Sequence, residues 1–348
     1  MTNIKHFKIL GILAVFMLQS CMEPDLDSVW DIERITTLNT IGYCRSAVVV
    51  NDTAYVAAGQ NGFQIWDMSA FINMGTDPTL VAAMDSYATE QDFDDITQVE
   101  YSQTHRVVFA VESNSLVNII DKIGSDSLDW DGAKMSEKTR EIRVIDDSSG
   151  FTIYAADNDD GLKWNYFELQ SWGEWFHTSG EEIWENGKPT GIDIVGNQLA
   201  LTTDQTGVSL YQLSDLKTNP EFINSVDTQG SADKVTLTNT GLFVASEEAG
   251  AYFIPFMDFP SSANRTPPEL LKTTRFAEDL YVKHISVSGN TAVLSLGSGG
   301  IALYDISNLF VPISRGIFEI GYVYKTVFES SYILACSREG LQVLSIKE

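Results

Sequence analysis

Residues 62–69 read GFQIWDMS, residues 207–214 read GVSLYQLS and residues 300–307 read GIALYDIS. Each stretch begins with a glycine and continues as a short strand-like segment rich in apolar residues. Two further short apolar or β-branched segments precede each one, separated from each other by a turn such as Asn51-Asp52. Three consecutive strands joined in this way form a β-meander, and its recurrence predicts a repeat architecture.

The residue that opens the third strand recurs along the whole chain. The seven positions are Gly62, Ser115, Gly161, Gly207, Gly250, Gly300 and Gly340. They lie 40 to 53 residues apart, and six of the seven are glycine, which a bend with positive φ favours. A period in the forties with three or four strands per unit is typical of a β-propeller. The sequence therefore predicts an all-β, seven-bladed β-propeller, with six or eight blades, or tandem β-sandwiches, as alternatives.

The order of strands also predicts how the ring closes. The first strands of the seven units are expected to begin near Arg45, Ile96, Glu141, Gly191, Lys234, Lys283 and Lys325. The seventh unit ends with its third strand, residues 341–347, whereas residues 32–38 have strand character and precede the first unit. An unpaired final strand would leave an open sheet edge. We therefore expect the N-terminal strand to complete the seventh blade.

These units resemble the LVIVD repeat of bacterial surface and secreted propellers. Residues 54–69 carry the resemblance, as do residues 300–307 with Pro312 downstream. It covers units one, four, six and seven well, and units two, three and five by spacing. The pair Trp66-Asp67 also resembles WD repeats. The function of the LVIVD family is poorly defined, so the resemblance implies a propeller fold and an extracytoplasmic setting.

The N-terminus has the features of an export signal. Lys5 and Lys8 are followed by an apolar run, residues 9–18, that is too short to span a bilayer. The sequence LQSC at residues 18–21 resembles the lipobox of bacterial lipoproteins, which implies cleavage before Cys21 and lipid (palmitate) on its sulfur. An ordinary signal peptide that contains a cysteine is the alternative.

The residues after the cysteine bear on the destination of the chain. Met22 follows Cys21, which favours the outer membrane, and residues 23–27 (EPDLD) resemble the acidic tether of Bacteroidetes-type surface lipoproteins. A plain acidic linker is the alternative to a surface-export tether. We expect a signal peptide over residues 1–20, a tether over residues 21–31 and a single propeller domain over residues 32–348. The expected location is the outer membrane, lipid-anchored and facing the cell surface.

Net charge excludes one class of partner. The 348 residues contain 22 Lys and Arg against 48 Asp and Glu, a formal net charge of -26. Such a chain would repel phosphates, so we expect no nucleic-acid partner working through basic patches.

No catalytic motif is present, and no histidine or cysteine has a partner at metal-ligand spacing. Because propeller loops converge on one axis, a site assembled from several blades stays open.

Two local features suggest binding. The acidic turn that contains Asp157, Asp159 and Asp160 could supply oxygen ligands to Ca²⁺, and a solvated turn is the alternative. Trp172, Trp175 and Trp184 fall in a segment that reads as a long excursion off blade three. Exposed aromatic rings there could form a platform for a sugar or a protein, and packing of the rings against their own blade is the alternative.

One face of the ring should collect charged loop residues. The connections before first strands and between second and third strands share this face, and ten carboxylates and three arginines fall in them. Our candidates for a ligand-binding face are Arg45, Asp95, Arg140, Asp233, Tyr281 and Arg338. A cationic or polyhydroxylated ligand, or a divalent ion, would suit such an acidic mouth, and a plain solvated face is the alternative.

The remaining cysteines lie at the two sides of the expected closure. Cys44 precedes blade one and Cys336 ends the second strand of blade seven, so ring closure should bring them close together. A disulfide between them would lock the ring, and two buried free thiols are the alternative.

Taken together, these features predict a non-catalytic cell-envelope lipoprotein whose propeller is a binding scaffold. Its partner would be an envelope protein or a glycan, with the membrane engaged through the lipid. The alternative is a polysaccharide hydrolase or lyase that uses carboxylates on the channel face. No cofactor is expected apart from the possible Ca²⁺ ion.

Overall fold

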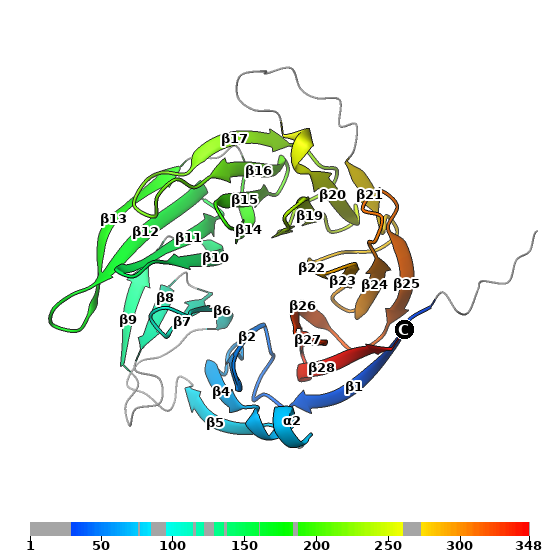
Figure 1. Ribbon diagram of the computed structural model, residues 1–348, viewed down its shortest axis with the longest axis horizontal. Helices are drawn as coiled ribbons and strands as arrows, with labels where there is room; N and C mark the ends of the chain where they lie inside the picture. The colour runs from blue at the N-terminus through cyan, green and yellow to red at the C-terminus, as the bar shows by residue number, and fades with distance from the viewer. Residues whose placement is uncertain are drawn as a thin grey trace, which may run out of the picture.

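Seven four-stranded antiparallel sheets surround a central axis, as the computed structural model shows (Figure 1). It describes residues 29–75, 77–84, 95–113, 116–121, 129–135, 138–159, 161–183, 187–259 and 273–347. The prediction of an all-β, seven-bladed propeller is therefore confirmed. The expected signal peptide, the lipidation site Cys21 and the tether residues up to 28 lie outside the described residues.

The blades follow one another along the chain. Blades one to three comprise β2 (Ser46–Val50), β3 (Thr53–Ala57), β4 (Phe63–Asp67) and β5 (Thr79–Met84); β6 (Ile96–Ser102), β7 (Val107–Glu112), β8 (Leu116–Asp121) and β9 (Asp129–Lys134); and β10 (Thr139–Asp146), β11 (Gly150–Asp157), β12 (Gly161–Leu169) and β13 (Trp175–Ile183). Blades four to six comprise β14 (Pro189–Val195), β15 (Gln198–Thr203), β16 (Gly207–Gln212) and β17 (Glu221–Val226); β18 (Lys234–Leu237), β19 (Gly241–Ala245), β20 (Ala251–Pro255) and β21 (Thr274–Phe276); and β22 (His284–Ser288), β23 (Thr291–Ser295), β24 (Ile301–Asp305) and β25 (Ile313–Phe318). Blade seven comprises β26 (Val323–Glu329), β27 (Tyr332–Ser337), β28 (Gly340–Lys347) and β1 (Asp31–Leu38). A short helix α2 (Ser69–Met74) and a 3₁₀ turn η2 (Phe256–Asp258) connect third to fourth strands in blades one and five.

Glycine opens the third strand because the fourth strand leaves no room for a side chain. Gly207 has φ of 81°, and a Cβ atom placed on it would lie 2.2 Å from the carbonyl oxygen of Val226. At Gly300, with φ of 77°, the same atom would lie 2.1 Å from the carbonyl oxygen of Phe318. All six predicted glycines have positive φ, and Ser115 lies outside the described residues. The repeat thus marks a close contact between backbones.

The N-terminal strand closes the ring as predicted. β1 pairs antiparallel with β28, from Asp31 opposite Lys347 to Leu38 opposite Leu341. A Cβ atom on Gly340 would lie 2.1 Å from the carbonyl oxygen of Leu38, which repeats the contact seen inside the other blades. β1 therefore takes the place of a fourth strand, and it covers the edge that β28 would otherwise expose.

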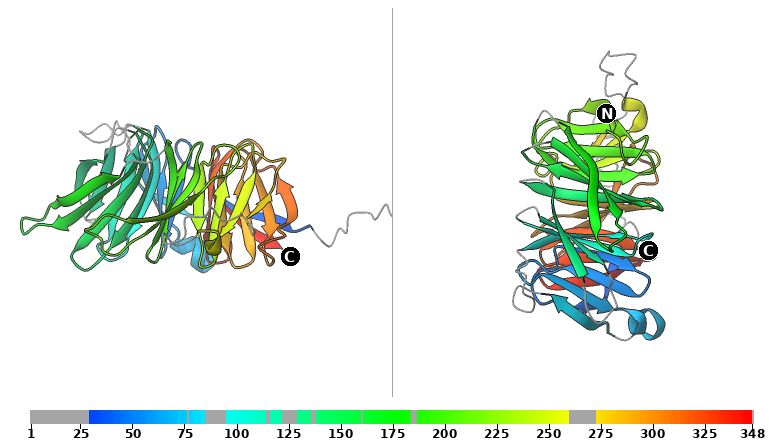
Figure 2. Two further views of the ribbon diagram at one scale, coloured as in Figure 1. Left: turned by 90° about the horizontal axis from the view of Figure 1, so that it is seen from above. Right: turned by 90° about the vertical axis from the view of Figure 1, so that its left-hand side faces the viewer.

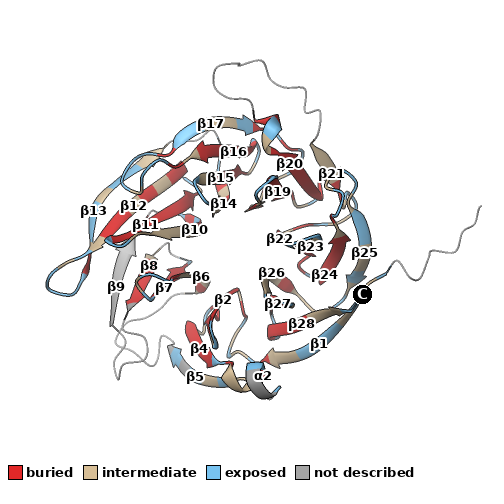
Figure 3. Cartoon of the chain, viewed as in Figure 1, coloured by how far each residue is buried: buried red, intermediate tan, exposed pale blue. Residues whose placement is uncertain are grey.

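Apolar side chains from neighbouring blades pack together, so the core is a ring of clusters between sheets. One cluster, for example, joins Phe243 and Phe253 of blade five to Leu294 and Tyr304 of blade six. Buried strands lie in the middle of each blade, and exposed segments lie mainly on the outermost strands (Figure 3). Within the part of the chain described, no helix is long and apolar enough to cross a membrane.

Candidate functional site in the central channel

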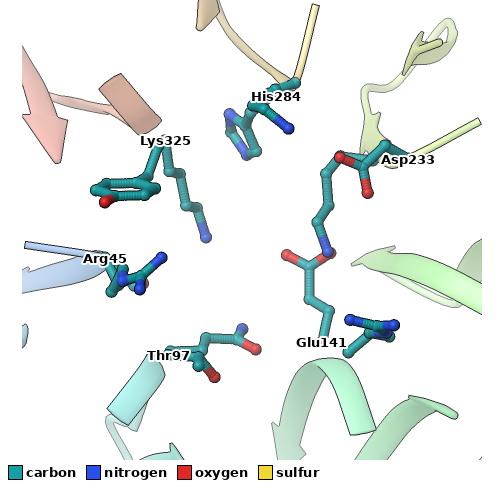
Figure 4. Close-up of a pocket in the computed structure, with 12 residues that line it drawn as sticks. Arg45, Thr97, Glu141, Asp233, His284 and Lys325 are labelled. Atoms are coloured by element: carbon teal, nitrogen blue, oxygen red, sulfur yellow. The ribbon is translucent and has the colours of Figure 1, made fainter. Parts of the chain in front are cut away.

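Polar residues converge at one mouth of the central channel, where they line a cavity of about 190 Å³ (Figure 4). Six of the seven blades each contribute two consecutive residues close to the start of the first strand. These are Arg45 and Ser46, Thr97 and Gln98, Arg140 and Glu141, Asp233 and Lys234, Lys283 and His284, and Tyr324 and Lys325. The first strands all lie innermost in their sheets, which is why residues far apart in sequence meet here.

The mouth is basic, although the chain as a whole is strongly acidic. Five lysines and arginines line the cavity, against two carboxylates. Several carboxylates of the surrounding face are paired beside it: Asp95 lies 3.5 Å from Arg45, and Glu247 lies 3.8 Å from Lys283. The expectation of an acidic mouth is therefore wrong. That expectation was based on the charges of loop residues around the whole face. The charge of the cavity itself depends on the residues at the starts of the first strands.

Glu141 is the buried carboxylate of the mouth. Its carboxylate lies 3.2 Å from the ammonium nitrogen of Lys234 and 3.3 Å from the guanidinium of Arg143. Burial alone would raise the pKa of Glu141, but Lys234, Arg143 and Lys325 together outweigh burial and lower the pKa to about 2. Glu141 is therefore ionised at neutral pH and already compensated by its neighbours.

On the other side of the mouth, three buried polar atoms have no hydrogen-bond partner among the described residues: Nδ1 of His284, Oγ of Ser46 and Nε of Arg45. His284 and Ser46 are only 7% and 2% exposed. Burial, followed by the charge of Lys325, holds the pKa of His284 well below its usual range. The imidazole is therefore neutral at physiological pH, in a cavity whose surroundings are positively charged.

A second, larger part of the channel, about 340 Å³, lies beyond His284 and Lys325, which line both parts. Its charge centre is Arg143 of β10. The guanidinium donates to Glu100 of β6 and to Asp193 of β14, at 2.9 Å in each case. Burial lowers the pKa of Arg143, but these carboxylates and Glu141 raise it above the usual value. The network ties three neighbouring blades together, and its charges are compensated within it.

Three of the six predicted face residues line the cavity, namely Arg45, Arg140 and Asp233. Asp95 lies beside the cavity, where its carboxylate accepts a hydrogen bond of 3.5 Å from the lining residue Arg45. Burial and neighbouring Glu247 raise the pKa of Asp233, although Lys234 opposes the shift.

The other two predicted face residues lie beside the cavity. The ring of Tyr281 lies 5.0 Å from the ammonium nitrogen of Lys283, and Arg338 lies over the ring of Tyr322 at 4.2 Å. Arg338 also donates to the hydroxyl of Tyr324, a lining residue, at 3.3 Å.

Sequence reasoning missed much of the site even though it named the relevant positions. Glu141, Lys234, Lys283 and Lys325 were each expected at or near the start of a first strand. Had the charges at these strand starts been counted together, the basic mouth would have been found. His284 gave no signal, because it occurs without a patterned partner in the sequence.

The aromatic platform is only partly present. Trp175 is buried, with its ring centroid 4.6 Å from that of Phe151 and 5.0 Å from that of His105, so its expected role in a platform is wrong. The segment is not an excursion either, since β13 begins at Trp175 and pairs with β12 along the blade. Trp172 is exposed in the turn between the two strands, and Trp184 lies outside the described residues.

The acidic turn is only partly satisfied by its own surroundings, because Oδ2 of Asp157 is buried without a hydrogen-bond partner among the described residues. Oδ1 of Asp157 accepts from the backbone N–H of Asp159, and the carboxylate of Asp159 lies 2.8 Å from the ammonium nitrogen of Lys138. Asp160 lies outside the described residues. Among those described, no three His, Cys, Asp or Glu side chains form a group that could hold a metal ion. The calcium site at this turn therefore stays a prediction.

The two cysteines meet at the closure. Cys44 and Cys336 are both buried and belong to the apolar cluster between blades seven and one. Both are free thiols. Burial and the neighbouring Cys336 raise the pKa of Cys44 well above its usual value. The expected proximity is confirmed, and a disulfide between them stays a prediction.

Comparisons with known proteins identify the fold. No family model and no curated protein matches the sequence. Among solved structures, the chain is similar to the structure of U3-55K (TM-score 0.65, 9% identity, 90% of this chain and 98% of that chain) and to the RRP9 WD40 repeats (0.66, 9%, 91% and 98%). It is also similar to the WD40 beta propeller domain of Doa1 (0.65, 11%, 92% and 97%). At these identities the likeness shows a shared architecture, so the chain has the fold of WD40 propellers.

Proposed function

We propose that the chain is a non-catalytic lipoprotein of the cell envelope whose propeller is a binding scaffold for a partner protein or glycan. The fold is consistent with a scaffold, because its stability rests on the blades and leaves loops and outer strands free for contacts. One surface feature carries the proposal, namely the hairpin of blade three.

The hairpin formed by β12 and β13 is the longest in the molecule that the structure describes, with nine residues in each strand. Its tip extends beyond the neighbouring blades (Figure 2, left). Leu169, Trp172 and Phe176 are exposed there, and Nε1 of Trp172 donates to Glu174 at 3.0 Å. Rigid exposed aromatic rings are typical hot spots of interfaces, and the aliphatic Leu169 beside them favours a protein over a sugar.

The envelope location rests on the sequence. A basic start, a short apolar run and the LQSC sequence ending at Cys21 support lipidation, and residues 23–27 support a surface-export tether. Replacing Cys21 by serine should release the chain from the membrane fraction and abolish its labelling by palmitate. Accessibility to protease on intact cells would then test whether the lipidated chain faces outward.

Co-purification from membranes tests the scaffold. We expect a partner to be recovered with the wild-type chain and to be lost, by about tenfold or more, from the double variant Trp172→Ala, Phe176→Ala. Met257→Ala is the matched control, because Met257 is as exposed as Trp172 (65% against 63%) but lies in blade five. Equal recovery with all three chains would contradict a role for the hairpin. A glycan array tests for a sugar partner instead: the wild-type chain and Met257→Ala should bind a glycan that the double variant binds more weakly.

The enzyme alternative rests on Asp233 and Glu141, the two carboxylates that line the mouth. A glycosidase pairs a carboxylic acid of raised pKa with an ionised carboxylate; burial raises the pKa of Asp233, and Lys234 and Arg143 keep Glu141 ionised. Hydrolysis or eliminative cleavage of a glycan panel by the purified chain would overturn the non-catalytic proposal.

A further inference from the structure

We propose that the basic channel mouth binds a small oxyanion, a molecule bearing a carboxylate or phosphate group. This site is separate from the hairpin of blade three, so it goes beyond the scaffold role and does not depend on it.

Unpaired hydrogen-bonding groups from three adjacent blades converge on one side of the cavity. Ser46 and Arg45 belong to blade one, Lys325 to blade seven and His284 to blade six. Oγ of Ser46, Nε of Arg45 and Nδ1 of His284 are all buried, and no described residue offers them a hydrogen-bond partner. Arg45, Lys325 and His284 extend into the cavity on neighbouring sides (Figure 4). Buried polar groups without hydrogen-bond partners lower the stability of a fold. A bound oxyanion would supply partners to these groups, so the arrangement points to a ligand.

The positive charge on this side is also only partly compensated. Among the residues that the structure describes, Lys325 has no ion pair, and Arg45 has a long one of 3.5 Å to Asp95. On the opposite side, Glu141 is already occupied by Lys234 and Arg143. The mouth is therefore divided into a paired half and a half that attracts negative charge. The net charge of -26 makes this local excess of cations stand out from the rest of the chain.

The size of the cavity limits the ligand. The cavity has a volume of about 190 Å³, which is room for a small ligand together with several water molecules. Phosphate or a short dicarboxylate fits within such a volume. Lysine and arginine are the residues that bind carboxylate and phosphate groups through charge-assisted hydrogen bonds, and Ser46 adds a neutral donor.

Calorimetric titration of the full-length chain in detergent tests the site, with inorganic phosphate and succinate as separate probes at constant ionic strength set with chloride. We expect saturable binding of at least one probe. Lys325→Met should weaken it by about tenfold to a hundredfold, because one charge-assisted hydrogen bond is lost, and Ser46→Ala by about fivefold. Comparing the two probes shows whether the site prefers a phosphate or a carboxylate.

Lys347→Met is the matched control, since it removes the same charge from an exposed ion pair with Glu33 outside the channel. It should leave the affinity within about twofold. Equal weakening by Lys325→Met and Lys347→Met would show that only diffuse charge matters and would overturn the site. Failure of both probes to bind the folded wild-type chain would overturn it as well. If the hairpin variants recovered the partner as well as the wild type, the hairpin proposal would fail but the oxyanion site would not. The two proposals can therefore fail separately.

Discussion

The two parts of the central channel use the same kinds of charged residue in opposite ways. In the larger part, Arg143 lies within 3.3 Å of Glu100, Asp193 and Glu141, the carboxylate of the mouth, so each of these charges has a partner. At the mouth, Lys325 has no ion pair among the described residues, and the buried Nδ1 of His284 has no hydrogen-bond partner. Compensated buried charges hold neighbouring blades in place, whereas uncompensated ones are retained at a cost to stability. This difference separates the structural part of the channel from the part that we assign to a ligand.

The strongest test of the difference removes Arg143. Arg143→Met would leave three carboxylates close together without their common cation, so we expect the free energy of unfolding to fall by about 3 to 5 kcal/mol. Urea unfolding measures the change. A loss below about 1 kcal/mol would show that the network is not structural, and the distinction between the two parts would fail.

Acid should weaken the compensated part through Glu141. Its folded pKa of about 2 lies below the ordinary value of 4.5, so its ionised form stabilises the fold fully above pH 4.5. This contribution, about 3 kcal/mol, is lost as the pH falls from 4.5 towards 2. Urea unfolding of the wild type and of Glu141→Gln across this window should show a smaller pH dependence in the variant. Equal slopes would contradict the pairing.

His284 should make the mouth sensitive to milder acid. Because its folded pKa lies well below the ordinary value of 6.5, the unfolded chain takes up a proton below pH 6.5 that the folded chain does not. Stability should therefore decrease as the pH falls below 6.5, by up to about 1.4 kcal/mol per pH unit. Burial is the main cause of the lowered pKa; the charges of Lys325, Arg143 and Lys234 add to it, and Glu141 opposes it. His284→Asn should remove this component of the slope, and an unchanged slope would show that His284 is not held neutral.

The smallest expected change in stability is also informative. Lys325→Met should alter the free energy of unfolding by no more than about 0.5 kcal/mol. Lys325 has no ion pair among the described residues to lose, and its attraction to Glu141 is opposed by its repulsion of the other cations at the mouth. Thermal unfolding beside Lys347→Met measures the change. A large loss from Lys325→Met would show that this lysine is structural, and the mouth would then no longer differ from the Arg143 network.

Much of the fold could be predicted because the repeat is encoded locally. A glycine such as Gly207 is required by a carbonyl oxygen of its own blade, so its spacing reveals the blade without any knowledge of the ring. The closing strand was predictable for a similar reason, since a blade with three strands has an open edge that an extra strand can fill. The location in the envelope rests on residues before the described part, and it stays a prediction.

The aromatic residues show where this reasoning ends. Trp172 and Trp175 lie three residues apart, yet one is exposed in a turn and the other packs against Phe151. The choice depends on where β13 begins, and pairing with β12 sets that point. The sequence contains the rings but does not specify which of them face solvent.

By itself, the sequence determined seven blades, their glycine bends and the N-terminal closure, because each depends on contacts within one repeat or between its edges. Only the tertiary structure decided the character of the channel. Six blades place pairs of residues around one axis, and a charge such as Lys325 meets His284 and Ser46 only when the ring is closed. Net charge is a sum over the whole surface, whereas the potential in a cavity depends on the few charges nearest to it. A chain with a net charge of -26 can for that reason have a basic mouth.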